Sequence, residues 1–241
     1  MIPPRALLID LDDTIIVDSV GSDERYRQAC AEVAVQDGRC TGDALWAALD
    51  GRLQWYWSDP ERHRLGRLDL DATRRANVVA ALAAIDISDD AMTDTLLANL
   101  ATRRHAAVEP FPEAIMAIER IRATGVRTAL LTNGAAAAQQ AKIDRFNLAR
   151  LFDVIVIEGA FGHGKPEERV YRHALDALNV RAEETWMVGD NLEWEVLAPQ
   201  RLGITGVWID HAGAGVPEDA PEKLAHIIRS LGELVPLVCA P

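Results

Sequence analysis

Three acidic residues stand close together near the start of the chain, where an apolar run ends. Asp10, Asp12 and Asp13 follow the apolar stretch at residues 6–9. Because side chains alternate along an extended chain, Asp10 and Asp12 are expected to point into one crevice while Asp13 turns away. One carboxylate of such a pair can act as a nucleophile and ligate a hard cation, and the other can transfer a proton. Taken alone, the segment is equally consistent with an acidic turn or a helix cap.

A second polar group follows another apolar run at residues 126–131. Thr132, Asn133 and Gly134 come directly before a predicted helix. A hydroxyl, an amide and backbone N–H groups at a helix N-terminus are suited to bind a phosphate. Thr132 or Asn133 could instead cap the helix, and the two uses of the same geometry are compatible.

A glycine-rich segment at residues 159–164 delivers a single lysine, Lys165. Its spacing imitates a nucleotide-binding P-loop, but Pro166 stands where the Ser or Thr that holds Mg²⁺ would be, which disfavours that interpretation. Lys165 fits better as a point charge that neutralises a phosphoryl oxygen and nearby carboxylates. The alternative is an ordinary lysine on the surface.

Two more acids follow the fourth apolar run, at residues 186–188. Asp190 leaves that run as Asp10 leaves the first, and Glu195 lies five residues further on, in a predicted helix. Together with Asp10 they would repel one another unless a divalent cation lay among them. No His or Cys accompanies these acids, so Mg²⁺ is favoured over Zn²⁺.

The elements that position these residues alternate along the chain. Short apolar runs, typical of buried strands, occur at residues 6–9, 126–131, 154–157, 186–188 and 205–209. Helical patterns occur at residues 111–123, 135–146, 167–178 and 193–202. Strands that alternate with single helices indicate an α/β fold with a mostly parallel, Rossmann-like sheet.

Residues 17–107 break this alternation, because they contain no convincing strand and are expected to be helical. Thr41 is predicted to cap a helix at 42–51 and Asp71 a helix at 72–85. A third helix, with Ser88, Asp89 and Asp90 at its start, is predicted to run to residue 105. The predicted domains are therefore a core formed by residues 1–16 and 108–241, and an inserted all-helical domain at 17–107.

Composition excludes several classes of protein. The 241 residues carry a formal net charge of −12, which disfavours binding to nucleic acid backbones and to anionic membrane surfaces. Three cysteines without a CxxC pattern indicate neither a disulfide framework nor a zinc site. No apolar run approaches the length needed to span a membrane, and no signal peptide is evident, so a cytoplasmic location is expected.

The ordered set of motifs resembles the haloacid dehalogenase (HAD) superfamily. The matching motifs are Asp10-x-Asp12-x-Thr14, Thr132-Asn133-Gly134, Lys165-Pro166 and Gly189-Asp190-x4-Glu195. The resemblance implies that Asp10 is a nucleophile that forms an aspartyl-phosphate. It implies that Asp12 protonates the leaving group and later activates water.

The resemblance also implies roles for the other motif residues. Thr132 and the Asn133 N–H would hold phosphoryl oxygens, and Lys165 would stabilise their charge. Mg²⁺ would be bound by Asp10, the Asp12 carbonyl and Asp190, with Glu195 acting through water where many members have Asp.

A phosphatase is favoured within this superfamily because Asp12 supplies a proton donor. The resemblance implies a Mg²⁺-dependent phosphomonoester hydrolase that acts on a small phosphorylated metabolite. Two alternatives stay open: a metal-free 2-haloacid dehalogenase, and a non-catalytic binding protein of the same fold. The expected assembly is a monomer or a homodimer.

The helical insert resembles a C1 cap, a domain that closes over the site in this superfamily. It is rich in aromatic and basic residues, namely Trp46, Trp55, Tyr56, Trp57, Arg62, His63, Arg64, Arg67, Arg74 and Arg75. These residues either form the core and the solvated faces of the insert or contact the substrate. The sequence does not identify the substrate.

Overall fold

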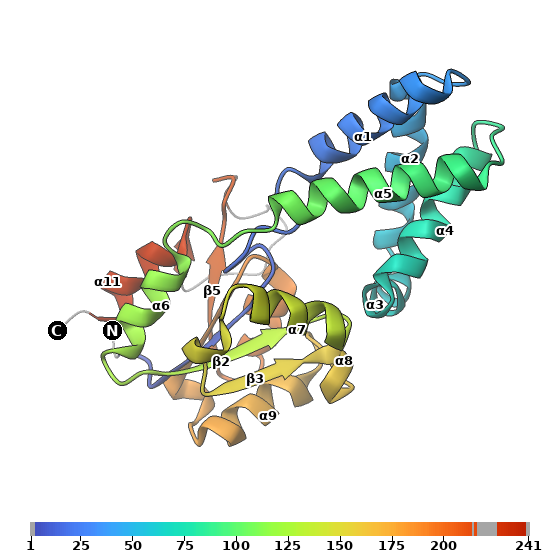
Figure 1. The fold of residues 1–241 in the computed structure, drawn as a ribbon. Coiled ribbons are helices and arrows are strands. Elements are labelled where there is room, and N and C mark those ends of the chain that lie inside the picture. Colours follow the sequence, from blue (N-terminus) through green and yellow to red (C-terminus); the bar gives the residue numbers. More distant parts are fainter. Residues whose placement is uncertain (1–2, 214, 216–225, 240–241) are drawn as a thin grey trace. The chain divides into compact units, whose positions relative to one another are not determined.

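A six-stranded parallel sheet is present in a computed structural model that describes residues 3–213, 215 and 226–239 (Figure 1). The strand order is β3-β2-β1-β4-β5-β6. The strands are β1 (Ala6–Ile9), β2 (Arg127–Thr132), β3 (Val154–Ile157), β4 (Thr185–Gly189), β5 (Thr205–Ile209) and β6 (His226–Ile228). The predicted α/β fold is therefore confirmed. The short strand β6 was not predicted.

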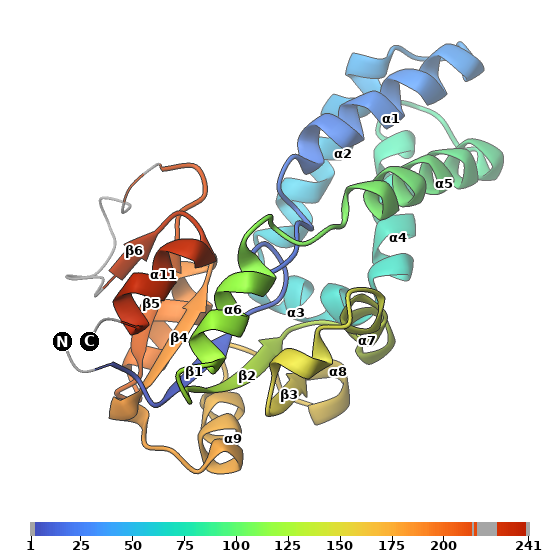
Figure 2. The ribbon, with the colours of Figure 1, turned by 60° about the vertical axis from the view of Figure 1, so that its left-hand side comes forward.

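The central strands are apolar because helices cover both faces of the sheet. All four residues of β1 are fully buried. One face packs against α9 (Glu168–Leu178), whose residues share a core cluster with Leu8, Leu131 and Met187. On the other side lie α6 (Ala114–Arg122) and α11 (Leu234–Val238), as Figure 2 shows. Helix α7 (Ala136–Arg145) connects β2 to β3.

The chain forms two compact units. The first, called here the core unit, consists of Met1–Val17 and Glu109–Pro241, and the second, the helical unit, of Asp18–Val108. The helical unit is thus inserted between β1 and β2, as a C1-type cap.

The helical unit consists of five helices, and the structure places no strand in it. They are α1 (Ser22–Asp37), α2 (Gly42–Trp57), α3 (Pro60–Leu68), α4 (Leu70–Ala83) and α5 (Asp90–Ala107). Thr41 caps α2, because its hydroxyl accepts a hydrogen bond from the Ala44 N–H at 3.2 Å, as predicted. The predicted cap of α4 by Asp71 is wrong. Asp69 caps that helix, which starts two residues earlier than expected and leaves Asp71 in its first turn.

The helical unit has a hydrophobic core of its own. Trp46 is buried among side chains of α1, α4 and α5, which supports a packing role for this aromatic. Trp55 differs, because it is about half exposed and lies between the guanidinium groups of Arg52 and Arg62, 4.0 and 3.9 Å from its ring centre. Trp57 packs edge-on against His63.

The core unit also contains several short helices. Two of them lie where a single longer helix was predicted. The short helices include α8 (Glu158–Phe161), α10 (Ala198–Gln200) and the 3₁₀ turns η1 (Ala149–Leu151), η2 (Ala182–Glu184) and η4 (Leu231–Glu233). The segment predicted as one α-helix at 193–202 is instead the π-helix η3 (Leu192–Leu197) followed by α10. A π-helical turn is rare and commonly lies at a functional site.

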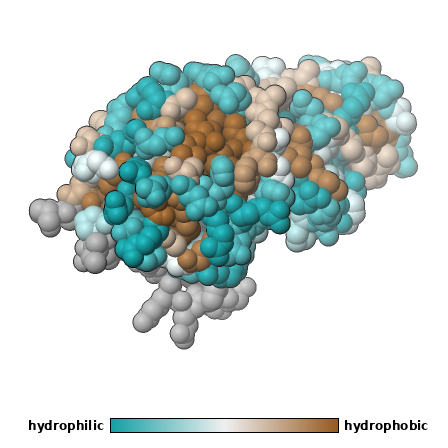
Figure 3. All heavy atoms as spheres, turned by 90° about the horizontal axis from the view of Figure 1, so that it is seen from below, coloured by the Kyte–Doolittle hydropathy of each residue, from teal (hydrophilic) through white to brown (hydrophobic). Residues whose placement is uncertain are grey.

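The surface is mixed in polarity. On the face shown in Figure 3, a hydrophobic patch on the core unit is bordered by hydrophilic residues. Within the described residues, no helix has the length and apolar character needed to cross a membrane.

Candidate active site

The polar residues singled out in the sequence gather at one edge of the sheet. In the parallel register, Ile9 pairs with Leu130 and with Val188, so β1, β2 and β4 reach the same level at their carboxyl ends. Open α/β sheets bind their ligands at this edge. The residues that lie at or directly after these strand ends are Asp10, Thr132 and Asp190.

Lys165 lies at the centre of this edge. Its Nζ forms an ion pair with Asp10 Oδ1 and a second with Glu195 Oε1 at 2.7 Å. The lysine is only 1% exposed, so the interpretation as a surface lysine is wrong. The P-loop imitation also fails in the structure, because α8 occupies Glu158–Phe161 where a phosphate-binding loop would lie.

The loop that carries Lys165 is held by Asn133. The Asn133 amide donates to the Lys165 carbonyl at 2.7 Å, and its Oδ1 accepts from the Lys165 N–H at 2.8 Å. Capping of the next helix by Thr132 or Asn133 is wrong, because Ala135 is the N-cap of α7 and no side chain caps it. The Gly134 N–H donates instead to Glu158 Oε2 at 2.8 Å.

The π-helix η3 brings Glu195 into the site. Both Glu195 oxygens are occupied, one by Lys165 and the other by the Asn191 N–H at 2.8 Å. Tyr171, which is fully buried, donates its hydroxyl proton to the Trp194 carbonyl and so fixes this turn. A Cβ at Gly189 would lie 2.1 Å from Glu195 Cγ, so only glycine leaves room for the glutamate.

The site contains more negative charge than its lysine balances. Burial, followed by the charges of nearby carboxylates, raises the pKa of Asp190 to about 9; those carboxylates are Asp10, Glu195 and Asp13. Burial is also the main reason why the pKa of Glu195 rises to about 7 despite its bond with Lys165. For Lys165, burial favours the neutral amine, but the two bound carboxylates outweigh it and raise the pKa of its ammonium group.

This charge pattern fits a hard divalent cation. Two carboxylates, Asp10 and Asp190, repel each other in a buried, oxygen-rich site, and a cation between them would remove that repulsion. No cluster of three or more His, Cys, Asp or Glu side chains suited to a metal occurs among the described residues. The predicted ligand set does not need one, because its third ligand is the Asp12 backbone carbonyl.

Asp12 and Asp13 occupy different surroundings. Asp12 accepts hydrogen bonds from two side chains of α7, at 2.6 and 2.8 Å. Asp13 is buried, and its charge contributes to the raised pKa of Asp190. Its backbone has a φ of 56°, in the left-handed region, which breaks the alternation expected of an extended strand.

The two side chains that contact Asp12 are Gln139 and Lys142, which sequence reasoning missed. Gln139 Nε2 also contacts Thr132 Oγ1 at 2.5 Å, so Asp12 and Thr132 share one partner. A signal was present, since both residues fall on the same helix face as the apolar Ile143. Polar residues on the inward face of an amphipathic helix are unusual and point to a specific partner.

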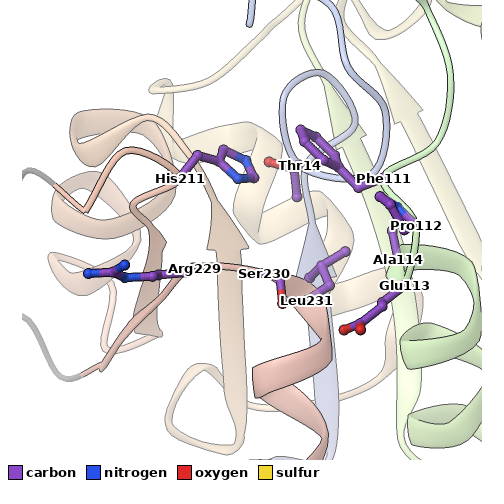
Figure 4. A pocket seen from close by; sticks show the side chains of 9 residues that line it. All are labelled: Thr14, Phe111, Pro112, Glu113, Ala114, His211, Arg229, Ser230 and Leu231. Atoms are coloured by element: carbon purple, nitrogen blue, oxygen red, sulfur yellow. The ribbon is translucent and has the colours of Figure 1, made fainter.

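The core unit also contains a pocket. Its lining, shown in Figure 4, includes Thr14, Phe111, Glu113, His211 and Arg229. The ring of His211 stacks on Phe111 with centres 4.5 Å apart, and its Nε2 lies 2.7 Å from the Asp13 carbonyl. His211 therefore links the segment after β5 to the loop that carries the acidic residues.

Known proteins resemble the chain over nearly its full length. A phosphoserine phosphatase from Thermus thermophilus is 31% identical, with 90% of this chain and 92% of the relative covered. The HAD-hydrolase YfnB from Bacillus subtilis, solved with magnesium bound, has the same fold, with a TM-score of 0.71, 20% identity and coverage of 98% and 99%. A 2-haloacid dehalogenase from Pseudomonas syringae gives a TM-score of 0.62 at 25% identity, with coverage of 100% and 99%.

The family assignment comes from a family match that covers well over half of the chain. Residues 4–203 match the haloacid dehalogenase-like hydrolase family, and this range includes the four sequence motifs. Together with the strand order and the helical insert, this match identifies the chain as a hydrolase that belongs to the haloacid dehalogenase-like hydrolase family.

Proposed function

We propose that the protein is a Mg²⁺-dependent phosphomonoesterase that acts on a small phosphorylated metabolite. One observation supports this proposal above all: the Asp10 and Asp12 carboxylates lie at one edge of the sheet and have different hydrogen-bond partners. Asp10 is held by the buried Lys165, whereas Asp12 shares Gln139 with Thr132. A nucleophile, a proton donor and a hydroxyl for the phosphate are thus supplied by neighbouring strand ends.

In the first step, an Asp10 carboxylate oxygen attacks phosphorus and the bond from phosphorus to the leaving oxygen breaks. Asp12 gives its proton to that oxygen, so the alcohol leaves neutral and the phosphoryl group remains on Asp10. In the second step, Asp12 takes a proton from water as the water attacks phosphorus, and the bond from phosphorus to the Asp10 oxygen breaks. Inorganic phosphate is released and both aspartates are restored.

Thr132, Asn133 and Lys165 would receive the phosphoryl group. Lys165 is desolvated and fixed by two ion pairs, so its charge does not need to reorganise as the phosphoryl oxygens arrive. Mg²⁺ would be held by Asp10, the Asp12 carbonyl and Asp190, with Glu195 acting through water. When bound, it would neutralise charge on the phosphate and between the carboxylates.

The dehalogenase alternative is disfavoured by Asp12. Halide leaves without a proton, so a dehalogenase does not need a proton donor such as the Asp12 carboxyl group beside Thr132. The similarity to a phosphoserine phosphatase over nearly the full chain also supports a phosphatase. An intact set of reactive residues disfavours a binding protein without activity.

A substrate panel tests the proposal. Purified protein is incubated with about a hundred phosphorylated metabolites and with 2-haloacids, each with Mg²⁺ and with excess chelator, while phosphate and halide release are measured. We expect phosphate release from a subset of small phosphate esters in Mg²⁺ alone. Halide release in chelator would establish the dehalogenase alternative, and full phosphatase activity in chelator would reject the metal site.

A further inference from the structure

Helix α7 holds the Asp12 carboxylate on both of its oxygens. Lys142 Nζ lies 2.6 Å from Asp12 Oδ1, and Gln139 Nε2 donates to Asp12 Oδ2 at 2.8 Å. These two donors come from a helix more than a hundred residues away in the sequence. The contacts belong to the core unit alone, because β1, β2 and α7 all lie in it.

Both donors are buried to an extent that is unusual for their residue types. Gln139 is 3% exposed and Lys142 is 9% exposed. A buried ammonium group is costly unless a carboxylate is close, and Asp12 is such a carboxylate. An apolar pair at the same positions would pack against the sheet without this cost. The residue types at positions 139 and 142 are therefore explained by their hydrogen bonds to Asp12 and not by packing in the core.

Gln139 also ties Asp12 to the next strand. The same Nε2 atom lies 2.5 Å from Thr132 Oγ1 and 2.9 Å from the Asn133 carbonyl. One amide group thus joins the end of β1 to the end of β2. Movement of Asp12 relative to the residues that would receive the phosphate requires these contacts to break.

We propose that Gln139 and Lys142 are positioning residues that hold Asp12 at a fixed place beside Thr132, where it delivers its proton to the leaving group. The proposal rests on the proposed function, in which Asp12 is the proton donor. Neither residue needs to touch the substrate. Both act through the carboxylate that they hold.

This role predicts a dependence on the leaving group. As the bond from phosphorus to the leaving oxygen breaks, a phenolate or alkoxide needs a proton from Asp12, whereas 4-nitrophenolate leaves without one. Phenyl phosphate and 4-nitrophenyl phosphate have nearly the same shape, so they differ mainly in this need. A displaced Asp12 should slow the hydrolysis of phenyl phosphate more.

The test compares kcat/KM for the two esters in Gln139→Leu and Lys142→Met. We expect the value for phenyl phosphate to fall about 10- to 100-fold more than the value for 4-nitrophenyl phosphate, since positioned acid catalysis typically contributes a factor of 10² or more. Lys142→Arg, which keeps a cation, should restore most of the loss. Gln140→Leu is the matched control, because Gln140 is the next residue on α7 and is exposed.

A second arm asks whether the residues act through Asp12. In an Asp12→Asn background, Lys142→Met and Gln139→Leu should change kcat/KM for phenyl phosphate less than about threefold, because coupled residues are not additive. An equal loss for both esters, or full additivity with Asp12→Asn, would overturn the proposal and indicate a structural role.

Crystal structures of the wild type and of the Gln139→Leu, Lys142→Met double variant separate this inference from the proposed function. We expect the Asp12 carboxylate to leave its wild-type position in the double variant. An unmoved carboxylate would overturn the inference even if the enzyme is a phosphatase. If the wild type hydrolyses neither ester with Mg²⁺, the proposed function and the proton delivery fail together, and the structures still decide whether α7 positions Asp12.

Discussion

Among the described residues, the buried charged side chains lie in the core unit, whereas the charged side chains of the helical unit are all at least partly exposed. In the core unit, Lys165 and Glu195 are each 1% exposed and lie 2.7 Å apart. In the helical unit, the guanidinium groups of Arg39, Arg75 and Arg103 pair with carboxylates at the surface. Exposed pairs contribute little to stability, whereas buried charges are costly unless they are compensated. A protein retains buried charges of this kind where they perform chemistry.

The two units therefore differ in how their charged side chains are solvated. At the sheet edge of the core unit, Asp10, Lys165 and Glu195 are buried and held by ion pairs, which suits them to stabilise a reacting group. The helical unit keeps its stability in an apolar core and leaves its charges in contact with water. Its surface can therefore accept substitutions without loss of the fold.

The largest effect is expected from Asp10→Asn. The change removes the nucleophile while it keeps the volume of the side chain and a partner for Lys165, so the fold should survive. Turnover should fall by about three orders of magnitude or more. Phosphate release and circular dichroism provide the two measurements. Retention of more than about a tenth of wild-type activity would contradict a covalent role for Asp10.

Lys165→Met should affect both activity and stability. It leaves Asp10 and Glu195 buried without their cation, a change that typically costs about 3–5 kcal/mol. The free energy of unfolding from urea titration measures this loss. Arg64→Met in the helical unit is the matched control, because Arg64 forms an exposed pair with Glu61 and should unfold almost like the wild type. A similar loss of unfolding free energy in both variants would contradict the proposed difference between buried charges in the core unit and exposed charges in the helical unit.

Much of the fold could be predicted from sequence, because buried parallel strands are short apolar runs and helices separate them. The three runs at β1, β3 and β5 have the observed bounds. The single α-helix predicted over 193–202 was wrong because the six residues of the π-helix η3 are too few to show a period of their own. This turn depends on tertiary contacts such as that of Tyr171 with the Trp194 carbonyl. The three-residue strand β6 carries too few residues for a pattern.

The candidate site was predictable where its residues follow strand ends and less so where helices contribute. Asp10, Thr132 and Asp190 owe their places to the common edge of a parallel sheet, which local sequence indicates. Gln139 and Lys142 meet Asp12 only through tertiary packing of α7. The left-handed backbone at Asp13 likewise depends on the fold around it.

The pH dependence of stability probes the excess negative charge. In the protein without metal, Asp190 has a pKa of about 9, above its ordinary value of 3.8, so the folded state binds a proton that the unfolded state has lost. Stability should therefore fall as the pH rises from about 4 to about 9. Thermal unfolding in chelator measures the slope. Mg²⁺ and Asp190→Asn should each reduce this slope. Stability that does not change with pH in chelator would contradict an excess of negative charge around Asp190.

Trp57→Ala should change substrate choice more than chemistry. We expect it to alter the ranking of substrates by about 1–3 kcal/mol, the range for one lost pocket contact. The measurement is the ratio of kcat/KM for the best natural substrate to that for 4-nitrophenyl phosphate. Trp46→Ala is the control, since Trp46 is buried in the helical core and should lower stability without changing the ratio. An unchanged ratio for Trp57→Ala would reduce its role to packing.

The smallest effect is expected from Thr14→Val, which tests how the core unit treats a polar group outside the charge cluster. The Thr14 hydroxyl is buried and has no hydrogen-bond partner among the described residues, whereas the equally buried Thr128 hydroxyl donates to the Leu151 carbonyl at 2.6 Å. Replacing a hydroxyl by a methyl group removes a desolvation cost in the first case and a hydrogen bond in the second. Thr14→Val should therefore leave the free energy of unfolding unchanged or slightly higher, and Thr128→Val should lower it by about 1–3 kcal/mol. Equal losses in both variants would mean that Thr14 binds a partner in the pocket of Figure 4.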